Sequence, residues 1–417
     1  MIVCILVCLT SNLWAQPSAT VTCKLCHTPQ HVAGKGHHNL TCRSCHYSKQ
    51  GVLSDPASRE HGSSGCTNCH QGYEQIYSHA MGTRTKERQF VDRSYAKRDH
   101  LFFSKNCASC HLKGCTDCHN KGHAVQRPSS AVCQRCHKAY FIGADYSGRA
   151  PREDHQRYQR GSWDNGVAYL TMSPDVHHQR GIQCGSCHTM KSLVAGKKTG
   201  KTCRECHVPS MRVVEHRIGA HMRKVTCEAC HAAWTAQEYG TFYLHAPDGI
   251  VPEAFDALPR TSKEYVKSAY LKRQNLPPLG VNASGSIAPI RPQFIAYYSR
   301  ISKRRGNNDD NQLLAAEWKV VTPHTIQRGT APCHACHQNP SRFLHEPEHK
   351  RIYDLKGDGM GLSSFWRHEG QRVINGSFVD IKQILRLQQI TSTPAYQKAY
   401  VKKWKQITTP GAHSSKR

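Results

Sequence analysis

The stretch Cys107-Ala-Ser-Cys-His-Leu-Lys-Gly-Cys-Thr-Asp-Cys-His119 contains two Cys-x-x-Cys-His motifs separated by only three residues. The same motif occurs ten times along the 417 residues and uses 20 of the 22 cysteines. Its cysteine pairs are Cys23 and Cys26, Cys42 and Cys45, Cys66 and Cys69, Cys107 and Cys110, Cys115 and Cys118, Cys133 and Cys136, Cys184 and Cys187, Cys203 and Cys206, Cys227 and Cys230, and Cys333 and Cys336. The histidines that close the motifs are His27, His46, His70, His111, His119, His137, His188, His207, His231 and His337. Two thiols three residues apart lie on one face of a helical turn, so both can bind the same ligand.

This spacing is the attachment signature of c-type haem, in which both thiols form thioethers to one haem and the histidine binds its iron. Structural zinc and disulfide scaffolds also use Cys-x-x-Cys pairs, but neither requires a histidine after all ten of them. We therefore predict ten covalently bound haem c groups, with the twenty cysteines as attachment points and the ten motif histidines as proximal iron ligands. The three-residue spacer before Cys115 means that two of these haems must nearly touch.

The composition bears on the fold expected for such a chain. Hydrophobic residues make up only 38% of the sequence, below the roughly 45–50% of ordinary domains. Ten porphyrins would supply the missing apolar surface. We therefore predict a mostly irregular chain with short α-helices and little β structure, packed around its haems.

The charge of the chain points to its partners. The formal net charge is +28, and part of this excess is expected to pair with haem propionates. The surplus favours acidic redox proteins, an anionic substrate or an anionic membrane surface. The sequence contains no nucleic-acid-binding motif, so we expect no nucleic-acid partner.

The motifs divide the chain into regions. We expect residues 1–15 to be a secretory signal peptide, because an apolar run ends at Ala15; this predicts export to the periplasm or the cell surface. Residues 16–245 carry nine motifs, and equal motif spacings indicate a duplicated three-haem unit at 23–70 and 184–231. A haem-free insert at 246–332, a tenth haem site at 333–345 and a helical tail at 346–417 follow.

Histidines outside the motifs are candidates for the second axial iron ligand. An iron with two histidine ligands passes electrons, whereas an iron with one open position can bind substrate. The sequence has 29 histidines, more than twenty such ligands would need, which favours electron transfer. The distal candidates are His31, His37, His38, His61, His79, His100, His123, His177, His216, His221, His245, His324 and His345.

The motif set resembles multihaem c-type cytochromes of anaerobic respiration. The segment Asp175-Val-His-His-Gln-Arg-Gly-Ile-Gln-Cys-Gly-Ser-Cys-His188 is similar to segments of octahaem tetrathionate reductases and hydroxylamine oxidoreductase relatives. In those proteins the early histidine is a distal ligand, which implies that role for His177. The chain departs from them in having ten motifs and no motif that ends in lysine. It also resembles outer-surface cytochromes of metal-reducing bacteria, some of which assemble into filaments.

Two functions follow as hypotheses. The first is a decahaem electron conduit outside the cytoplasm, which exchanges electrons with redox proteins or with membrane and outer-membrane components, with self-assembly into a filament as a variant. The alternative is a reductase of a small oxyanion such as tetrathionate, nitrite or selenite, with one open haem near His337. In that case the pocket would involve Arg328, His334 or His345.

Overall fold

The structure is a computed structural model that describes part of the chain. The described residues are 37, 40, 42–46, 64–108, 112, 114–119, 125–137, 142–151, 163–164, 167–196, 200–301, 310–345, 372–389, 397–398, 401–402 and 404–405. The expected signal peptide and the first motif, with Cys23, Cys26 and His27, lie outside these residues.

The chain forms two compact units. The first comprises residues 1–71 and 113–127, and the second comprises 72–112 and 128–417. The described helices of the first unit are α1 (Cys42–His46), α2 (Ser64–Thr67) and α6 (Thr116–His119). Each of them lies on a Cys-x-x-Cys-His motif.

The helices of the second unit are short. In the described part none exceeds nine residues, the length of α4 and α15. Helices of this length depend on packing for their stability. They are η3 (Tyr73–Ser78), α3 (Ala80–Thr83), α4 (Thr85–Arg93), η4 (Tyr95–Lys97), α5 (Phe102–Asn106), α7 (Ser130–Gln134), α8 (Gly143–Tyr146), α9 (Val176–Gln179), α10 (Cys184–Cys187), α11 (Met190–Val194), η7 (Cys203–Glu205), η8 (Glu215–Arg217), α12 (Gly219–Lys224), α13 (Cys227–His231), η9 (Glu253–Phe255), α14 (His334–His337), η10 (Pro340–Phe343) and α15 (Ile381–Gln389).

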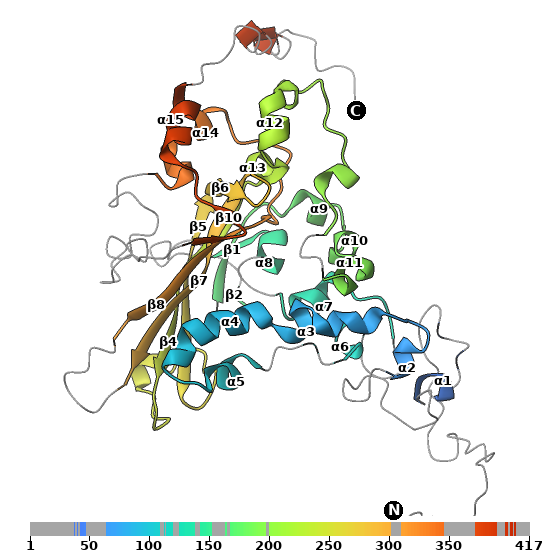
Figure 1. Cartoon of the computed structure of the whole chain (residues 1–417), viewed down its shortest axis with the longest axis vertical. Coiled ribbons are helices and arrows are strands. Elements are labelled where there is room, and N and C mark those ends of the chain that lie inside the picture. Colours follow the sequence, from blue (N-terminus) through green and yellow to red (C-terminus); the bar gives the residue numbers. More distant parts are fainter. Residues whose placement is uncertain are drawn as a thin grey trace, which may run out of the picture. The chain divides into compact units, whose positions relative to one another are not determined.

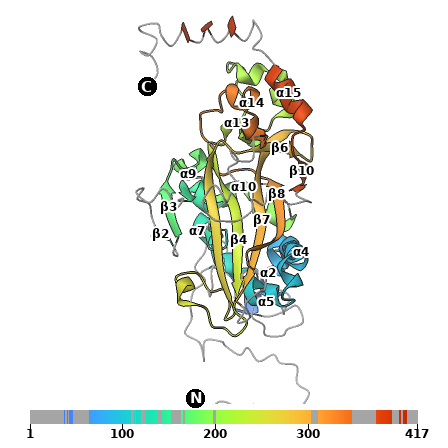
Figure 2. The ribbon, with the colours of Figure 1, turned by 90° about the vertical axis from the view of Figure 1, so that its left-hand side faces the viewer.

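A seven-stranded mixed sheet dominates the second unit (Figures 1 and 2). Its strand order is β10-β6-β7-β4-β5, and β8 pairs with β7 and β9. The β4–β7 and β8–β9 pairs are parallel and the others are antiparallel. The strands are β4 (Trp234–His245), β5 (Tyr265–Asn275), β6 (Leu279–Asn282), β7 (Ile287–Arg300), β8 (Gln312–Val320), β9 (Arg372–Ile374) and β10 (Gly376–Ser377).

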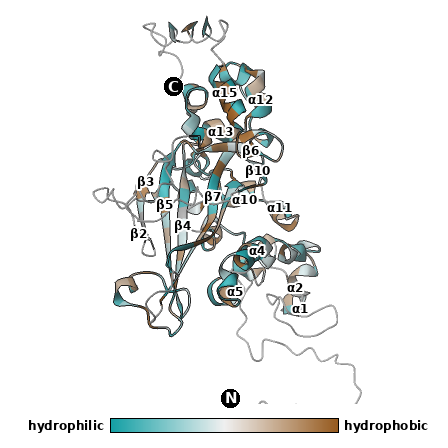
Figure 3. Ribbon diagram, turned by 60° about the vertical axis from the view of Figure 1, so that its left-hand side comes forward, coloured by the Kyte–Doolittle hydropathy of each residue, from teal (hydrophilic) through white to brown (hydrophobic). Residues whose placement is uncertain are grey.

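Strand β7 shows how the sheet separates two apolar clusters. Successive strand residues point to opposite faces. Accordingly, Ala296 and Tyr298 pack with Phe102 of α5, whereas Ile295 and Tyr297 pack with the other cluster. That second cluster is built around Trp318. Brown stretches on β6, β7 and α15 in Figure 3 mark hydrophobic residues of these three elements.

Two groups of helices adjoin the large sheet at its ends. Helices α4 and α5 lie at one end, and α13, α14 and α15 lie at the other (Figures 1 and 2). At the second end Ala229 of α13, Leu279 of β6 and Ile384 of α15 share one apolar cluster. A smaller antiparallel sheet, in the order β1-β3-β2, is formed by β1 (Arg149–Pro151), β2 (Trp163–Asp164) and β3 (Val167–Thr171).

The expectation of a mostly irregular, haem-packed chain with little β structure is wrong. The sheet arises mainly from residues 234–320, most of which lie in the insert that lacks motifs. Two prolines in the longest strand argue against a strand when only the sequence is considered, because proline has no N–H to donate to a neighbouring strand. In β7, Pro292 lies beside a register shift, where the missing N–H is tolerated, and Pro289 pairs with Leu279 near the start of the strand.

No helix in the described part of the chain is both long and apolar enough to cross a membrane.

Candidate functional site

Local sequence builds each described motif into one helical turn. In α13 the five motif residues Cys227–His231 form a single helical turn. Thr226 precedes this helix in an extended conformation. At η7, Thr202 and Glu205 form a reciprocal capping box. A turn that is capped in this way holds two thiols and a histidine in fixed relative positions.

Five imidazole pairs are the main feature of the described motifs. In each pair a motif histidine faces a histidine from outside the motifs, and their ring centroids lie 6.0–6.4 Å apart. The pairs are His70 with His37 at 6.1 Å, His207 with His177 at 6.0 Å, His188 with His324 at 6.4 Å, His231 with His216 at 6.3 Å, and His337 with His221 at 6.1 Å.

This spacing has a simple chemical meaning. An imidazole nitrogen binds a metal at about 2.0–2.1 Å, so two rings on opposite sides of one metal have centroids roughly 6.3 Å apart. Rings stacked directly on each other would lie closer together. The centroid distances of the five pairs match this separation.

Hydrogen bonds at Nδ1 orient three of the paired rings. His177 Nδ1 lies 2.8 Å from Asp175 Oδ1, His216 Nδ1 lies 3.2 Å from the carbonyl of Ser210, and His337 Nδ1 lies 3.0 Å from the carbonyl of Leu387. An acceptor at Nδ1 fixes the tautomer and leaves Nε2 for a metal. Asp175 is the only carboxylate among these three acceptors.

Asp175 also joins two of the pairs. Its Oδ1 accepts from the His177 backbone amide at 2.8 Å, and its Oδ2 accepts from the Ile326 amide at 2.7 Å. Ile326 is two residues from His324, so one buried carboxylate holds the backbone of two distal candidates. Sequence reasoning missed Asp175, although its position two residues before His177 is a typical helix N-cap.

The pair His188–His324 is the most deeply enclosed. Burial, with the nearby His188, lowers the pKa of His324 to about 4. A neutral imidazole is the form that binds a metal.

Contacts between cysteines place neighbouring motifs side by side. The thiols of Cys133 and Cys184 are hydrogen-bonded, as are those of Cys203 and Cys227. The nearby Cys206 helps to raise the pKa of Cys187, and the nearby Cys336 helps to raise the pKa of Cys230, after the larger effect of burial in each case. These contacts arrange five motifs in one row. In order along the row, the histidines that close these motifs are His137, His188, His207, His231 and His337.

Arg342 links the last two motifs of this row. It is almost fully buried, and it donates to the carbonyl of Ala229 in one motif and to Cys336 Sγ in the other. The tenth motif is isolated in sequence, yet it adjoins the ninth. Nothing in the sequence around Arg342 marked it for this position.

The other predicted distal candidates lie elsewhere. His79 packs against Gly196, and His100 and His345 are exposed. His245 is at the end of β4, where its ring stacks on Tyr265 and its Nδ1 lies 2.9 Å from the Tyr298 hydroxyl. His31, His38, His61 and His123 lie outside the described residues, as do Cys110 and His111. Within the described residues no ring faces His119 or His137 at the spacing of the five pairs.

The donor geometry of the described motifs bears on structural zinc. A tetrahedral zinc site brings its ligand atoms within roughly 3–4 Å of one another. A search of the described residues for three or more His, Cys, Asp or Glu ligand atoms within 4.8 Å of one another finds Asp99, His245 and Glu264. None of these three is a motif residue. In the described motifs the thiols therefore do not converge with the paired imidazoles as the ligands of a zinc ion would.

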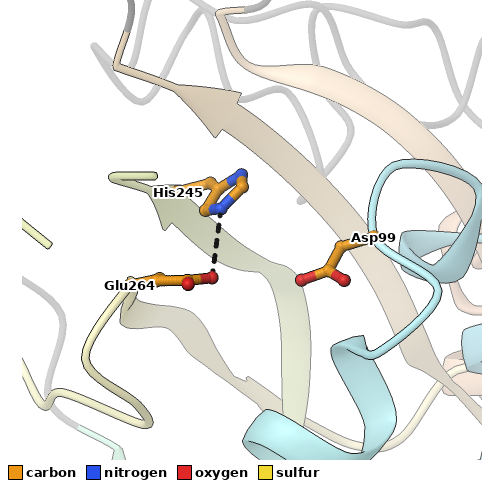
Figure 4. A group of neighbouring side chains, drawn as sticks. All are labelled: Asp99, His245 and Glu264. Atoms are coloured by element: carbon orange, nitrogen blue, oxygen red, sulfur yellow. Dashed lines mark ion pairs between the residues drawn. The ribbon is translucent and has the colours of Figure 1, made fainter. Parts of the chain in front are cut away.

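The Asp99–His245–Glu264 group is an ion-pair network (Figure 4). The Lys105 ammonium lies 3.0 Å from Asp99 and 2.7 Å from Glu264, and the Tyr265 hydroxyl donates to Asp99. Burial alone would raise the pKa of Asp99, but hydrogen bonds from Lys105, the Leu101 amide and Tyr265 outweigh it and lower the pKa. Lys105 already supplies the positive charge that these carboxylates require.

No protein-family model matches the chain, and no curated protein or solved structure matches it either. The arguments about its function therefore depend on its own residues.

Proposed function

We propose that the protein is a multihaem c-type cytochrome that carries electrons through covalently bound haems outside the cytoplasm. The five imidazole pairs carry the proposal, because their spacing suits an iron with two axial histidines. Haem supplies one-electron chemistry when it is bound. The chain supplies two thiols for attachment, a proximal ring and a distal ring.

Two histidine ligands favour electron transfer over substrate chemistry. A haem held between two such histidines would have no open position for a small molecule at its iron. At the tenth motif the ring centroids of His221 and His337 lie 6.1 Å apart, so His221 would occupy the iron position that an oxyanion substrate would need. This geometry weighs against the alternative of a reductase with an open haem near His337.

The row of motif contacts supports conduction across the second unit. Cysteines of successive motifs touch or are electrostatic neighbours, so haems attached to them would lie close together. Electrons could then pass from haem to haem without a diffusing carrier. The positive net charge of +28 suits acidic redox proteins or an anionic membrane surface as partners.

The first test is a haem count with low-temperature EPR of the oxidised protein, produced in cells that attach haem c. We expect ten haems per chain and mainly low-spin signals. The variant His221→Ala should convert one haem to high spin, whereas His345→Ala, which removes an exposed ring, should leave the spectrum unchanged. A chain that binds zinc and no haem would overturn the proposal. A native high-spin signal that shifts with nitrite or tetrathionate would support the reductase.

A further inference from the structure

We propose that residues 396–407, here named the tail segment, form an amphipathic helix that lies on an anionic lipid surface. The proposal goes beyond the proposed function, because electron transfer through haems does not require contact with lipid. Three features of the segment support it: the helical and exposed conformation of its described residues, the separation of apolar from cationic residues, and the absence of acidic residues.

The described residues of the tail segment are helical and exposed. They are residues 397–398, 401–402 and 404–405. Val401 is 53% exposed and Trp404 is 59% exposed, although valine and tryptophan are mostly buried in folded proteins. A helix as short as this segment is marginal in water unless its apolar face is covered. The segment therefore needs a surface against which its apolar side chains can pack.

The sequence separates apolar from cationic side chains around such a helix. At about 100° per residue, the apolar side chains would fall within an arc of about 140°. They are Tyr396, Tyr400, Val401, Trp404 and Ile407. Three lysines would fall on the opposite side: Lys398, Lys402 and Lys405. A cationic face opposite a face that contains tryptophan is typical of helices that lie in the interface of a membrane.

Aromatic residues indicate that the apolar side suits lipid. Tyr396, Tyr400 and Trp404 have amphipathic rings, and such rings are enriched at the level of the lipid headgroups. Lys403 would fall at the edge of the apolar arc, where the stem of a lysine can lie along the surface while its ammonium reaches the headgroups. The side chains therefore suit an interface that is apolar on one side and charged at its rim.

No acidic residue weakens the positive charge of this region. Residues 381–417 contain eight Lys or Arg and no Asp or Glu. A cationic cluster of this kind is attracted by the negative surface potential of anionic lipids, and this attraction adds to that of the apolar side. The region therefore favours an anionic membrane over a neutral one.

The tail segment is separate in sequence from every haem attachment site. The last motif ends at His337, whereas the segment begins at Tyr396 and contains neither cysteine nor histidine. No haem is attached within the segment, and no iron takes a ligand from it. The segment therefore offers the same residues to a partner with or without the haems.

A lipid surface suits the segment better than other partners do. A nucleic acid would satisfy the lysines but offers no continuous apolar surface. An acidic protein would need a groove that buries the polar atoms of three Tyr and Trp rings, whereas at a membrane these atoms stay in the headgroup layer. The rest of this chain, and a second copy of it, are cationic, since the net charge is +28, and would repel the lysines.

The test measures cosedimentation of the full-length, haem-loaded protein with lipid vesicles. The vesicles contain phosphatidylcholine with roughly 30% phosphatidylglycerol, or phosphatidylcholine alone. An apolar variant combines Val401→Ser and Trp404→Ser. Its matched control combines Ile250→Ser and Phe255→Ser, at side chains that are 67% and 36% exposed.

A charge variant tests the cationic side of the segment. It combines Lys398→Glu, Lys402→Glu and Lys405→Glu. Its matched control replaces three exposed lysines elsewhere, in Lys86→Glu, Lys97→Glu and Lys263→Glu. Hydrogen exchange of the backbone amides of residues 396–407, with and without vesicles, gives a second and independent readout.

We expect the wild type to bind the anionic vesicles, and both tail variants to bind them about tenfold more weakly. Each control should differ from the wild type by less than about twofold. The anionic vesicles should slow exchange in the tail segment of the wild type, whereas the neutral vesicles should not.

Three results would overturn the proposal. The first is wild-type protein that does not sediment with the anionic vesicles. The second is a loss of binding in the charge variant without a loss in the apolar variant, because this would show attraction by charge alone. The third is full protection of the tail amides without vesicles, because this would show that the segment packs on the protein itself. A haem count on each sample reports failure of the proposed function separately.

Discussion

The sheet and the segment 200–231 obtain their stability in different ways. In the sheet, Trp318, Tyr265, Ile290 and Ile295 are fully buried. In residues 200–231 only Ala229 is buried, yet this segment supplies four of the ten paired imidazoles. The sheet has a core made of its own side chains, whereas the segment has almost none. The comparison teaches that one region is folded by apolar burial, whereas the other, in the proposed cytochrome, would be stabilised by the haems that it binds.

Blocking haem attachment should separate the two regions most strongly. In protein produced without haem attachment, we expect backbone amides of residues 200–231 to exchange on the order of a hundredfold faster than in the haem-loaded protein. Amides of β4 and β7 should stay protected. Hydrogen exchange with mass spectrometry measures both regions in one sample. Equal protection of residues 200–231 in both forms would break the comparison.

Removing a large side chain from the core of the sheet should lower the stability of the sheet and leave the histidine-bearing region unchanged. Trp318→Ala removes a fully buried side chain and should cost about 3–5 kcal/mol of unfolding free energy. The low-spin haem spectrum of the folded protein should not change. Urea unfolding followed by circular dichroism gives the energy. Trp404→Ala, at a side chain that is 59% exposed, is the control and should cost far less.

The Asp175 carboxylate offers a finer test of the histidine-bearing region. Asp175→Asn removes the anionic acceptor at His177 Nδ1 and should weaken the bond from His177 to iron about 10–100-fold. The readout is carbon monoxide binding to the reduced protein, which should gain one reactive haem. Asp256→Asn, at an exposed carboxylate, should gain none. Identical behaviour of the two variants would show that Asp175 is not a positioning residue.

The smallest expected effect concerns the ion pairs of Asp99. Its pKa is lowered in the folded protein, so its charge stabilises the fold above the unfolded pKa of about 3.9. This contribution is lost as the pH falls through the lowered folded value. Asp99→Asn should therefore remove about 1 kcal/mol at pH 7, and the difference from the wild type should shrink below about pH 4. Urea unfolding at pH 7 and pH 3.5 measures it; an equal difference at both values would contradict it.

The sequence could specify the motifs but not how the distal rings pair. Motif spacing is a local pattern, and all five described partners were among the distal candidates. Most of them face a motif other than the next one along the chain: His37 precedes Cys42 but faces His70, and His324 precedes Cys333 but faces His188. Only tertiary structure determines such pairings, because they join residues far apart in sequence.

The sheet escaped prediction for a different reason. Its strands carry charged residues such as Lys272 and Arg291 and two prolines, so the segment has no long apolar run. Strand preference depends on the neighbours that a residue meets across the sheet, more than on the residue itself. The alternation of Ile295, Ala296, Tyr297 and Tyr298 between two apolar clusters is visible only once both faces are covered.

The pair His221–His337 has a consequence for the topology of the chain. Residues 221 and 337 flank strands β4 to β8, and an iron that bound both histidines would close a covalent loop around most of the sheet. A cross-link around a loop of this length removes denatured-state entropy worth roughly 4–5 kcal/mol. The pair His188–His324 would close a second loop over the same strands. In the proposed cytochrome, the two haems would thus stabilise the sheet by restricting the unfolded chain, as disulfides do in small secreted domains. They would do so although none of the four histidines belongs to a strand of the sheet.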